Sequence, residues 1–369
     1  MTFKPLNEND IVATRTLLHE AIPLTGTIVS GTYGTFPDDD NIKNYSHGMF
    51  QSVYDYPYLS SSANHIFDIT VGISTKSALY SSITTAAGQQ AKKKNIYNQM
   101  SQVLMGYDAT GSILQFDEDG DIIAGGNKIN DAIIVPFSRL LVKDEIKKET
   151  FELTLGVSAS YSAPMGNTIT VSDVNASTEY RVNSPVGEYG ILYATGSGEL
   201  STASTHTASI GGTTYWYAGL LFYQAGIMVL TSSIFGSQLD NAGIGGAPLE
   251  YNVALEGIDA ALTGSQISSS SNDFRHRIQN LQFNNTTELN STVYFCRANH
   301  NEFNYSSNPT YVDGSKIRVK TQATDNPVSY ITTVGLYNDN NELIATAKLS
   351  EPLKKSPSTE FTIRTRLDY

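Results

Sequence analysis

Short alternating segments follow one another through the last hundred residues, and this pattern most limits what the chain can fold into. Between residues 360 and 368, apolar Phe361, Ile363 and Leu367 are separated by polar residues. Because side chains on a strand point alternately to its two faces, one face can be buried and the other solvated. The segments with this character are 277–283, 288–298, 316–320, 328–337, 342–349 and 360–368. They predict an antiparallel sheet that folds on itself as a β-sandwich, with a turn at Asn284–Thr287.

The composition fits a mainly β protein with a polar but weakly charged surface. Charged residues make up 16% of the 369 residues, against a typical share of about 25%. Ser, Thr, Asn and Gly take their place, together with 22 Tyr and 14 Phe. Burying an uncharged hydroxyl or amide costs less than burying a charge, so such a surface suits contacts between proteins.

The net charge of -12 argues against nucleic acid as a partner. A phosphate backbone would be repelled, and Lys92, Lys93 and Lys94 form the one compact basic cluster. We interpret these lysines as the solvated start of a helix, with an anion site as the alternative.

Cys296 is the single cysteine, and it lies in an apolar strand pattern, which favours a buried, unreactive thiol over a nucleophile. The first residues lack the apolar core of a signal peptide, which predicts assembly in a cytoplasm. The run Tyr215–Phe235 is long enough to span a bilayer, but Gln224 and its β-branched residues favour two buried strands. No membrane partner is expected.

The pattern of turns and helices predicts four regions. These are an N-terminal mixed α/β domain (1–150), a middle β domain (151–236), a linker or assembly arm (237–272) and the C-terminal β-sandwich (273–369). Helices are expected from Asp10 to Ala21, from Lys92 to Met105 and from Arg139 to Lys148.

Three aspartates at alternate positions, Asp117, Asp119 and Asp121, invite a calcium interpretation. An EF-hand loop places glycine sixth and glutamate twelfth, and neither fits here. An Asp-Gly turn at Gly120 is the simpler interpretation. No metal site is predicted.

The search for catalytic motifs returns nothing specific, so we expect no enzyme and no cofactor. The six histidines form no metal-ligand spacing, and the Gly-rich phosphate-binding and Gly-x-Ser-x-Gly motifs are absent. His47 with Asp55, or His65 with Asp68, could meet in space. A glycan hydrolase using Glu179 and Glu188 remains a third hypothesis.

Basic and aromatic residues beside the C-terminal strands are the candidate interface. Arginine and aromatic side chains are frequent anchors where proteins meet, although arginines at a strand rim can equally lie in water. The candidates are Arg275, Arg277, Arg297, Phe303, Tyr305 and Tyr311.

Several runs resemble structural proteins of contractile-tailed bacteriophages, including marine cyanobacterial phages. The longest is TELNSTVYFCRANHNEFNYS at 287–306, and the others are YITTVGLY at 330–337, AKLSEPL at 347–353 and NYSHGMFQSVYDYPY at 44–58. The resemblance covers most of the chain, with 74–88 and 236–272 less distinctive. It implies a virion component in the tail, baseplate or neck, in contact with copies of itself and other virion proteins. A receptor- or carbohydrate-binding module on the virion, with Trp216 and tyrosines as stacking platforms, is the alternative.

Overall fold

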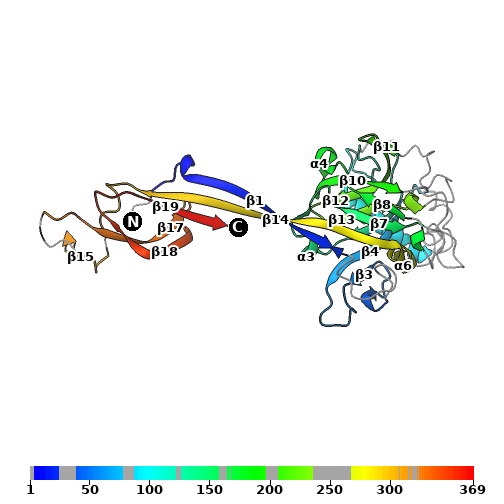
Figure 1. Ribbon diagram of the computed structural model, residues 1–369, viewed down its shortest axis with the longest axis horizontal. Coiled ribbons are helices and arrows are strands. Elements are labelled where there is room, and N and C mark those ends of the chain that lie inside the picture. The colour runs from blue at the N-terminus through cyan, green and yellow to red at the C-terminus, as the bar shows by residue number, and fades with distance from the viewer. Residues whose placement is uncertain are drawn as a thin grey trace. The chain divides into compact units, whose positions relative to one another are not determined.

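The computed structural model describes residues 4–24, 39–77, 87–121, 126–157, 164–166, 168–196, 207–235, 267–306, 308–314, 316–317, 322 and 324–369. Its packing divides the chain into two units. Unit 1 combines Met1–Leu18 with Glu288–Tyr369, and unit 2 is His19–Thr287. The fold is mainly antiparallel β with few helices, as the sequence predicted (Figure 1).

Two strands contribute residues to both units: β1 (Ile11–Pro23) and β14 (Ile278–Ala298), which are neighbours in the main sheet. Two predictions are wrong here. The helix expected from Asp10 to Ala21 is strand β1, preceded by the 3-10 turn η1 (Glu8–Asp10). The turn expected at Asn284–Thr287 is absent from β14, because Asn285 and Thr286 pair there with Ile146 and Glu145. Pairing with residues far along the chain overrides the local preference.

Unit 2 is built on one long sheet that also includes part of β14. Its order from β14 is β14-β7-β8-β10-β12-β13-β5-β4-β3-β2. The strands are β2 (Ile42–Asn44), β3 (Gln51–Tyr54), β4 (His65–Ile73), β5 (Asp131–Pro136), β6 (Glu145–Ile146), β7 (Glu152–Gly156), β8 (Thr168–Ser172), β9 (Arg181–Ser184), β10 (Gly187–Gly196), β11 (Thr207–Ile210), β12 (Thr213–Phe222) and β13 (Ile227–Thr231). The helices are η3 (Asp39–Asn41), α2 (Ala87–Leu104), α3 (Arg139–Val142), η4 (Pro164–Gly166), α4 (Ala176–Glu179), η5 (Ser232–Phe235) and α6 (Ile267–Arg277).

The run 215–235 contains two buried antiparallel strands, as predicted: β12 and β13 pair from Gly219 with Leu230 to Phe222 with Ile227. The second strand was predicted to reach Phe235, but it ends at Thr231 and residues 232–235 form η5. Among the described residues, the structure contains no helix with the length and apolar character needed to cross a membrane. The single tryptophan, Trp216, lies in β12 and is 8% exposed.

The main hydrophobic core lies in unit 2, between the sheet and its helices. Helix α2 packs against β4 so closely that a Cβ atom on Gly72 would lie 2.9 Å from the Cα of Tyr97, so only glycine fits there. The expected helix at 92–105 is confirmed, although Val103 of its predicted apolar face is 55% exposed. Lys93, predicted to be solvated, is buried, and this burial lowers its pKa to about 8.

The predicted domain boundaries do not follow the packing. The boundary at 150/151 falls inside the unit 2 sheet, where β5 pairs with β13 across it. The C-terminal region expected from 273 contributes α6 and the first part of β14 to unit 2, and unit 1 also takes in the first 18 residues. The expected arm at 237–272 lies outside the described residues up to 266, and its last residues belong to α6.

The described residues of unit 1 form part of the main sheet, a second two-stranded sheet and one short hairpin. The main sheet contributes parts of β1 and β14 together with β19 (Phe361–Asp368). β19 pairs with β14 from Ser291 with Asp368 to Ala298 with Phe361. β17 (Ser329–Tyr337) and β18 (Leu343–Lys355) form the second sheet, and β15 (Val312–Asp313) pairs with β16 (Lys316–Ile317). The strands predicted at 328–337, 342–349 and 360–368 are confirmed.

The alternation predicted for these strands is present, but neither of their faces is fully buried. On β19, Phe361, Ile363, Thr365 and Leu367 are half-buried. The residues between them, Thr362, Arg364 and Arg366, are exposed. The apolar positions of β17 and β18 are half-buried or exposed: Ile331 and Leu336 are half-buried, whereas Leu343 and Ile344 are exposed. Among its described residues, unit 1 has only Val293 and Ala298 as buried hydrophobic side chains.

Candidate assembly interface

The candidate interface lies in unit 1, where the loop 299–305 (Asn299–Tyr305) follows β14. The paired ends of β17 and β18 hold this loop. Ser329 and Lys355 are cross-strand partners in the sheet, and both bind loop atoms. The Ser329 hydroxyl donates to the Phe303 carbonyl, and Lys355 Nζ donates to the His300 carbonyl at 3.1 Å and to Asn304 Oδ1 at 2.8 Å.

Lys355 is fully buried and also donates to the Ser356 carbonyl at 2.9 Å. A buried ammonium group is stable only when its three donors are satisfied, and these three acceptors meet that need. The loop therefore takes its shape from a lysine that anchors it from within.

Further contacts fix the loop from its own residues and from the N-terminal segment. Glu302 accepts hydrogen bonds from the Asn299 backbone at 3.1 Å and from Lys4 Nζ at 2.5 Å. Asn304 Nδ2 donates to the His300 carbonyl at 2.7 Å. Hydrogen bonding from Lys4 is the first cause that lowers the pKa of Glu302, so this carboxylate stays charged.

The held loop displays two aromatic side chains. Phe303 has a φ of 55°, a left-handed conformation that a bulky side chain rarely adopts and that costs free energy. Phe303 is 45% exposed and Tyr305 is 55% exposed. The surroundings thus hold a strained backbone in place and leave two large rings in solvent, which is the arrangement of a preformed contact surface.

Tyr311, another predicted interface residue, lies against the ring of Tyr330 with a centroid distance of 6.4 Å and an edge-to-face angle of 65°. Tyr330 is itself 46% exposed. Arg297 is exposed, and its Nε lies 2.7 Å from Asp10 Oδ1, so it joins the N-terminal segment to β14 within unit 1.

Arg275 and Arg277 do not fit the predicted interface. Both lie at the end of α6 in unit 2 and are fully buried. Arg275 Nη2 donates to Asn272 Oδ1 at 3.2 Å, and Arg277 Nη1 donates to the Gly156 carbonyl at 3.3 Å. Their guanidinium groups form hydrogen bonds inside unit 2 and are not exposed to a partner, so the prediction of an interface role is wrong for both.

The sequence reasoning missed the second part of this surface, which is strand β1. Every residue from Ile11 to Ala21 is exposed, including Ile11, Val12, Leu17 and Leu18 at 41–51%. We had expected a helix here from the spacing of its apolar residues. The β-branched residues Ile11, Val12, Thr14 and Thr16 were the signal that could have identified a strand.

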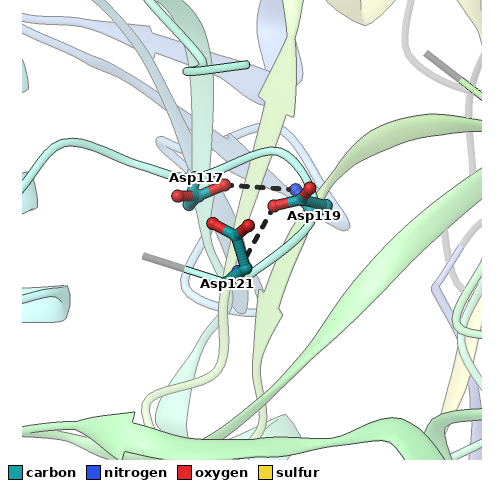
Figure 2. A group of neighbouring side chains, drawn as sticks. All are labelled: Asp117, Asp119 and Asp121. Atoms are coloured by element: carbon teal, nitrogen blue, oxygen red, sulfur yellow. Dashed lines mark hydrogen bonds between the residues drawn. The ribbon is translucent and has the colours of Figure 1, made fainter. Parts of the chain in front are cut away.

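The acidic loop at Asp117–Asp121 is a turn, as predicted, in which Gly120 takes a φ of +70°. The Asp119 amide donates to Asp117 and the Asp121 amide donates to Asp119, as Figure 2 shows. Carboxylate oxygens of the three residues lie within 4.8 Å of one another, so they could hold a cation. Asp117 is also bound by Lys128 Nζ, and burial is the main cause that raises the Asp117 pKa to about 6.

Of the residues considered for catalysis, one predicted pair meets, and the others bind residues outside the predicted pairs. His65 Nε2 lies 2.8 Å from Asp68 Oδ1, which confirms that this pair meets, but the Ser52 hydroxyl binds the same oxygen rather than the imidazole. Asp55 accepts from Asn64, and His47 accepts from the Met49 amide. Glu188 pairs with Lys148, whereas Glu179 accepts from Tyr193 at 3.4 Å.

Burial raises the pKa of half-buried Cys296, which disfavours the reactive thiolate.

No protein-family model, curated protein or solved structure matches this chain.

Proposed function

We propose that this chain is a structural subunit of a tailed-phage virion that forms contacts in the tail, baseplate or neck. Its work is to bind other copies of itself and other virion proteins, without catalysis, cofactor, nucleic acid or membrane. It would be assembled in the host bacterial cytoplasm. The observation that carries the proposal is that unit 1 leaves its apolar side chains on the surface.

The exposed large hydrophobic residues are concentrated in unit 1. Of those among the described residues, twelve lie in unit 1 and eight in unit 2, although unit 2 is the larger unit. The twelve are Ile11, Val12, Leu17, Leu18, Leu289, Phe303, Tyr305, Tyr330, Tyr337, Leu343, Ile344 and Tyr369. Extended apolar surface on a folded protein marks a site of interaction, because exposing it to water is unfavourable.

The loop 299–305 supports the same proposal, because partners gain affinity from aromatic anchors that are already held in place. The direct test is to purify virions, separate heads from tails and identify the chain by mass spectrometry with its copy number. We expect it in the tail fraction, in a multiple that fits a symmetric ring. Absence from both fractions would remove the proposal.

A carbohydrate-binding function on the virion is the second candidate, favoured by the exposed rings of Phe303, Tyr305 and Tyr330. Sugar rings stack on such faces. Trp216 is withdrawn from this alternative because it is buried. Glycan-array binding that is lost in Tyr305→Ala but kept in Tyr337→Ala would favour it over the assembly role.

A further inference from the structure

Strand β1 presents an unprotected sheet edge. It is the terminal strand of the main sheet, and among the described strands β14 is its neighbour. Within unit 1, the segment Ile11–Leu18 has Ile11, Ala13 and Leu17 on one face and Val12 and Leu18 on the other. Proteins usually blunt an edge with charges, proline, bulges or a covering segment, because unpaired backbone groups attract a further strand. In Ile11–Leu18, Arg15 is the single charged residue.

Within unit 1, the other strand that pairs with β14, β19, has the protection that β1 lacks. β19 pairs with β14 and carries exposed Arg364 and Arg366. Arg366 is held by Asp368 at 2.6 Å and by the Ser291 hydroxyl at 2.9 Å, so its charge stays at this edge. Two β19 strands brought together would face each other with like charges, which is unfavourable. The two edges therefore differ, and β1 is the one suited to pairing.

The distribution of charge indicates which partner fits. Unit 1 contains eleven Lys and Arg and eleven Asp and Glu residues, so its formal net charge is zero. The remaining 13 basic and 25 acidic residues lie in unit 2, which carries the whole net charge of -12. Two copies that meet through unit 1 bring together neutral surfaces, whereas contact through unit 2 would oppose two acidic surfaces.

We propose that β1 pairs through its edge with β1 of a second copy of this chain. A two-fold axis normal to the sheet makes the two strands antiparallel and joins the two sheets into one. The apolar residues on each face of β1 then lie beside those of the second copy and contact them across the strand pair. This inference rests on the proposed assembly function and names one of its contacts.

A disulfide scan tests the pairing in the full-length chain. In a Cys296→Ser background, single cysteines are placed in turn at each position from Ile11 to Leu18, and oxidised dimers are measured on non-reducing gels. In a two-fold antiparallel pair, a residue faces its own copy only at the axis, so the yield of dimer should peak at one position. Thr362→Cys on β19 is the matched control and should give no dimer above background.

A charge variant provides a second readout. Leu17→Lys with Leu18→Lys should shift the solution mass, measured by light scattering, from at least twice 40.1 kDa to 40.1 kDa. Leu343→Lys with Ile344→Lys changes equally exposed apolar residues of unit 1 and should leave the mass unchanged. Circular dichroism of both variants checks that the strands are retained.

The outcomes separate this inference from the broader proposal. An oligomer that survives the β1 lysines, or a flat disulfide scan, overturns β1 pairing while leaving the virion role in place. A wild-type chain that is monomeric in solution but present in purified tails also overturns it, and assigns the β1 edge to another virion protein. A monomer that is absent from virions overturns both.

Discussion

Units 1 and 2 are both rich in antiparallel strands, yet they bury apolar residues to different degrees. The sheet of unit 2 packs against helices and encloses Phe67, Leu220 and Phe222, which are fully buried. Strands β17 to β19 of unit 1 alternate much as β7 and β8 of unit 2 do, but their apolar positions are half-buried or exposed. The comparison teaches that alternating apolar and polar residues specify a strand but do not specify which layer packs on its apolar face. In unit 2 the covering layer belongs to the chain, and in unit 1 we infer that another chain supplies it.

Removing a core side chain should produce the largest effect. Phe67 lies in β4, is fully buried and contacts the ring of Phe137 with a centroid distance of 6.3 Å. Phe67→Ala should lower the free energy of unfolding by about 4 kcal/mol, because it leaves a cavity. The matched change in unit 1, Ile344→Ala, should stay within about 0.5 kcal/mol, because Ile344 is 65% exposed. Urea unfolding measures both, and equal losses would contradict the contrast.

Asp173 of unit 2 and Asp368 of unit 1 should contribute to stability with opposite pH dependence. Burial raises the pKa of Asp173 in unit 2 to about 6, against hydrogen bonds from Glu149, Phe151 and Tyr223. The pKa of the unfolded chain is about 3.9. The protonated form is therefore favoured in the folded state, and stability present below about pH 4 is lost as pH rises through about 6.

We expect the wild type to lose about 3 kcal/mol of unfolding free energy relative to Asp173→Asn between about pH 4 and pH 7. In unit 1, hydrogen bonds from Ser291 and Arg366 lower the pKa of Asp368, so its contribution is lost as pH falls below about 4. Denaturant titrations across pH measure the first difference, and hydrogen exchange in β19 follows the second. A pH-independent gap between wild type and Asp173→Asn would contradict the assignment.

Loss of the buried lysine should release the loop 299–305. Lys355→Met keeps an apolar stem but leaves three acceptors without their donor, which should cost about 2 kcal/mol. Hydrogen exchange at Asn299–Tyr305 should accelerate, while exchange in α2 of unit 2 stays unchanged. Lys354→Met, at the exposed neighbouring position, is the control. Unchanged exchange in the loop would show that Lys355 does not hold it.

The smallest effect is expected for a surface ion pair of unit 1. Arg15 of β1 pairs with Glu288 of β14, and the arginine side chain is 58% exposed. Solvent screens such a pair, so Arg15→Ala should change stability by less than about 1 kcal/mol and less still at high salt. If the proposed pairing of β1 is correct, this variant should keep the oligomer, unlike the paired Leu17 and Leu18 variant. A large loss in both measurements would place Arg15 in the contact itself.

The sequence predicted the strand content and the strands β17, β18 and β19 because apolar and polar residues alternate along most of each segment. It failed at β1, where residues spaced at three and four positions imitate a helix while the β-branched residues pair with β14. It failed again at Asn284–Thr287, where turn-forming residues lie within a continuous strand because β6 pairs beside them. These outcomes depend on contacts distant in the sequence, which local patterns do not contain.

Only some residues of the candidate interface could be predicted, because the others depend on contacts between residues distant in the sequence. Phe303, Tyr305 and Tyr311 were predicted because aromatic residues beside basic ones are frequent interface anchors, and the structure exposes Phe303 and Tyr305. Arg275 and Arg277 were wrongly predicted to lie at the interface. The sequence does not show that their hydrogen-bond partners include the Asn272 side chain and the Gly156 carbonyl inside unit 2. Lys355 was missed because its role depends on the loop 299–305, which lies about fifty positions earlier in the chain.

Unit 1 draws its strands from both ends of the chain, and this has a consequence for synthesis. The segment up to Leu18 leaves the ribosome first, but its partners begin at Glu288. At about 5–20 residues per second, β1 waits roughly 15 to 50 seconds before β14 exists to pair with it. During this interval an unpaired apolar strand is present on every growing chain. If β1 pairs with β1 of a second copy as proposed, neighbouring ribosomes on one message would bring these strands together before β14 is made.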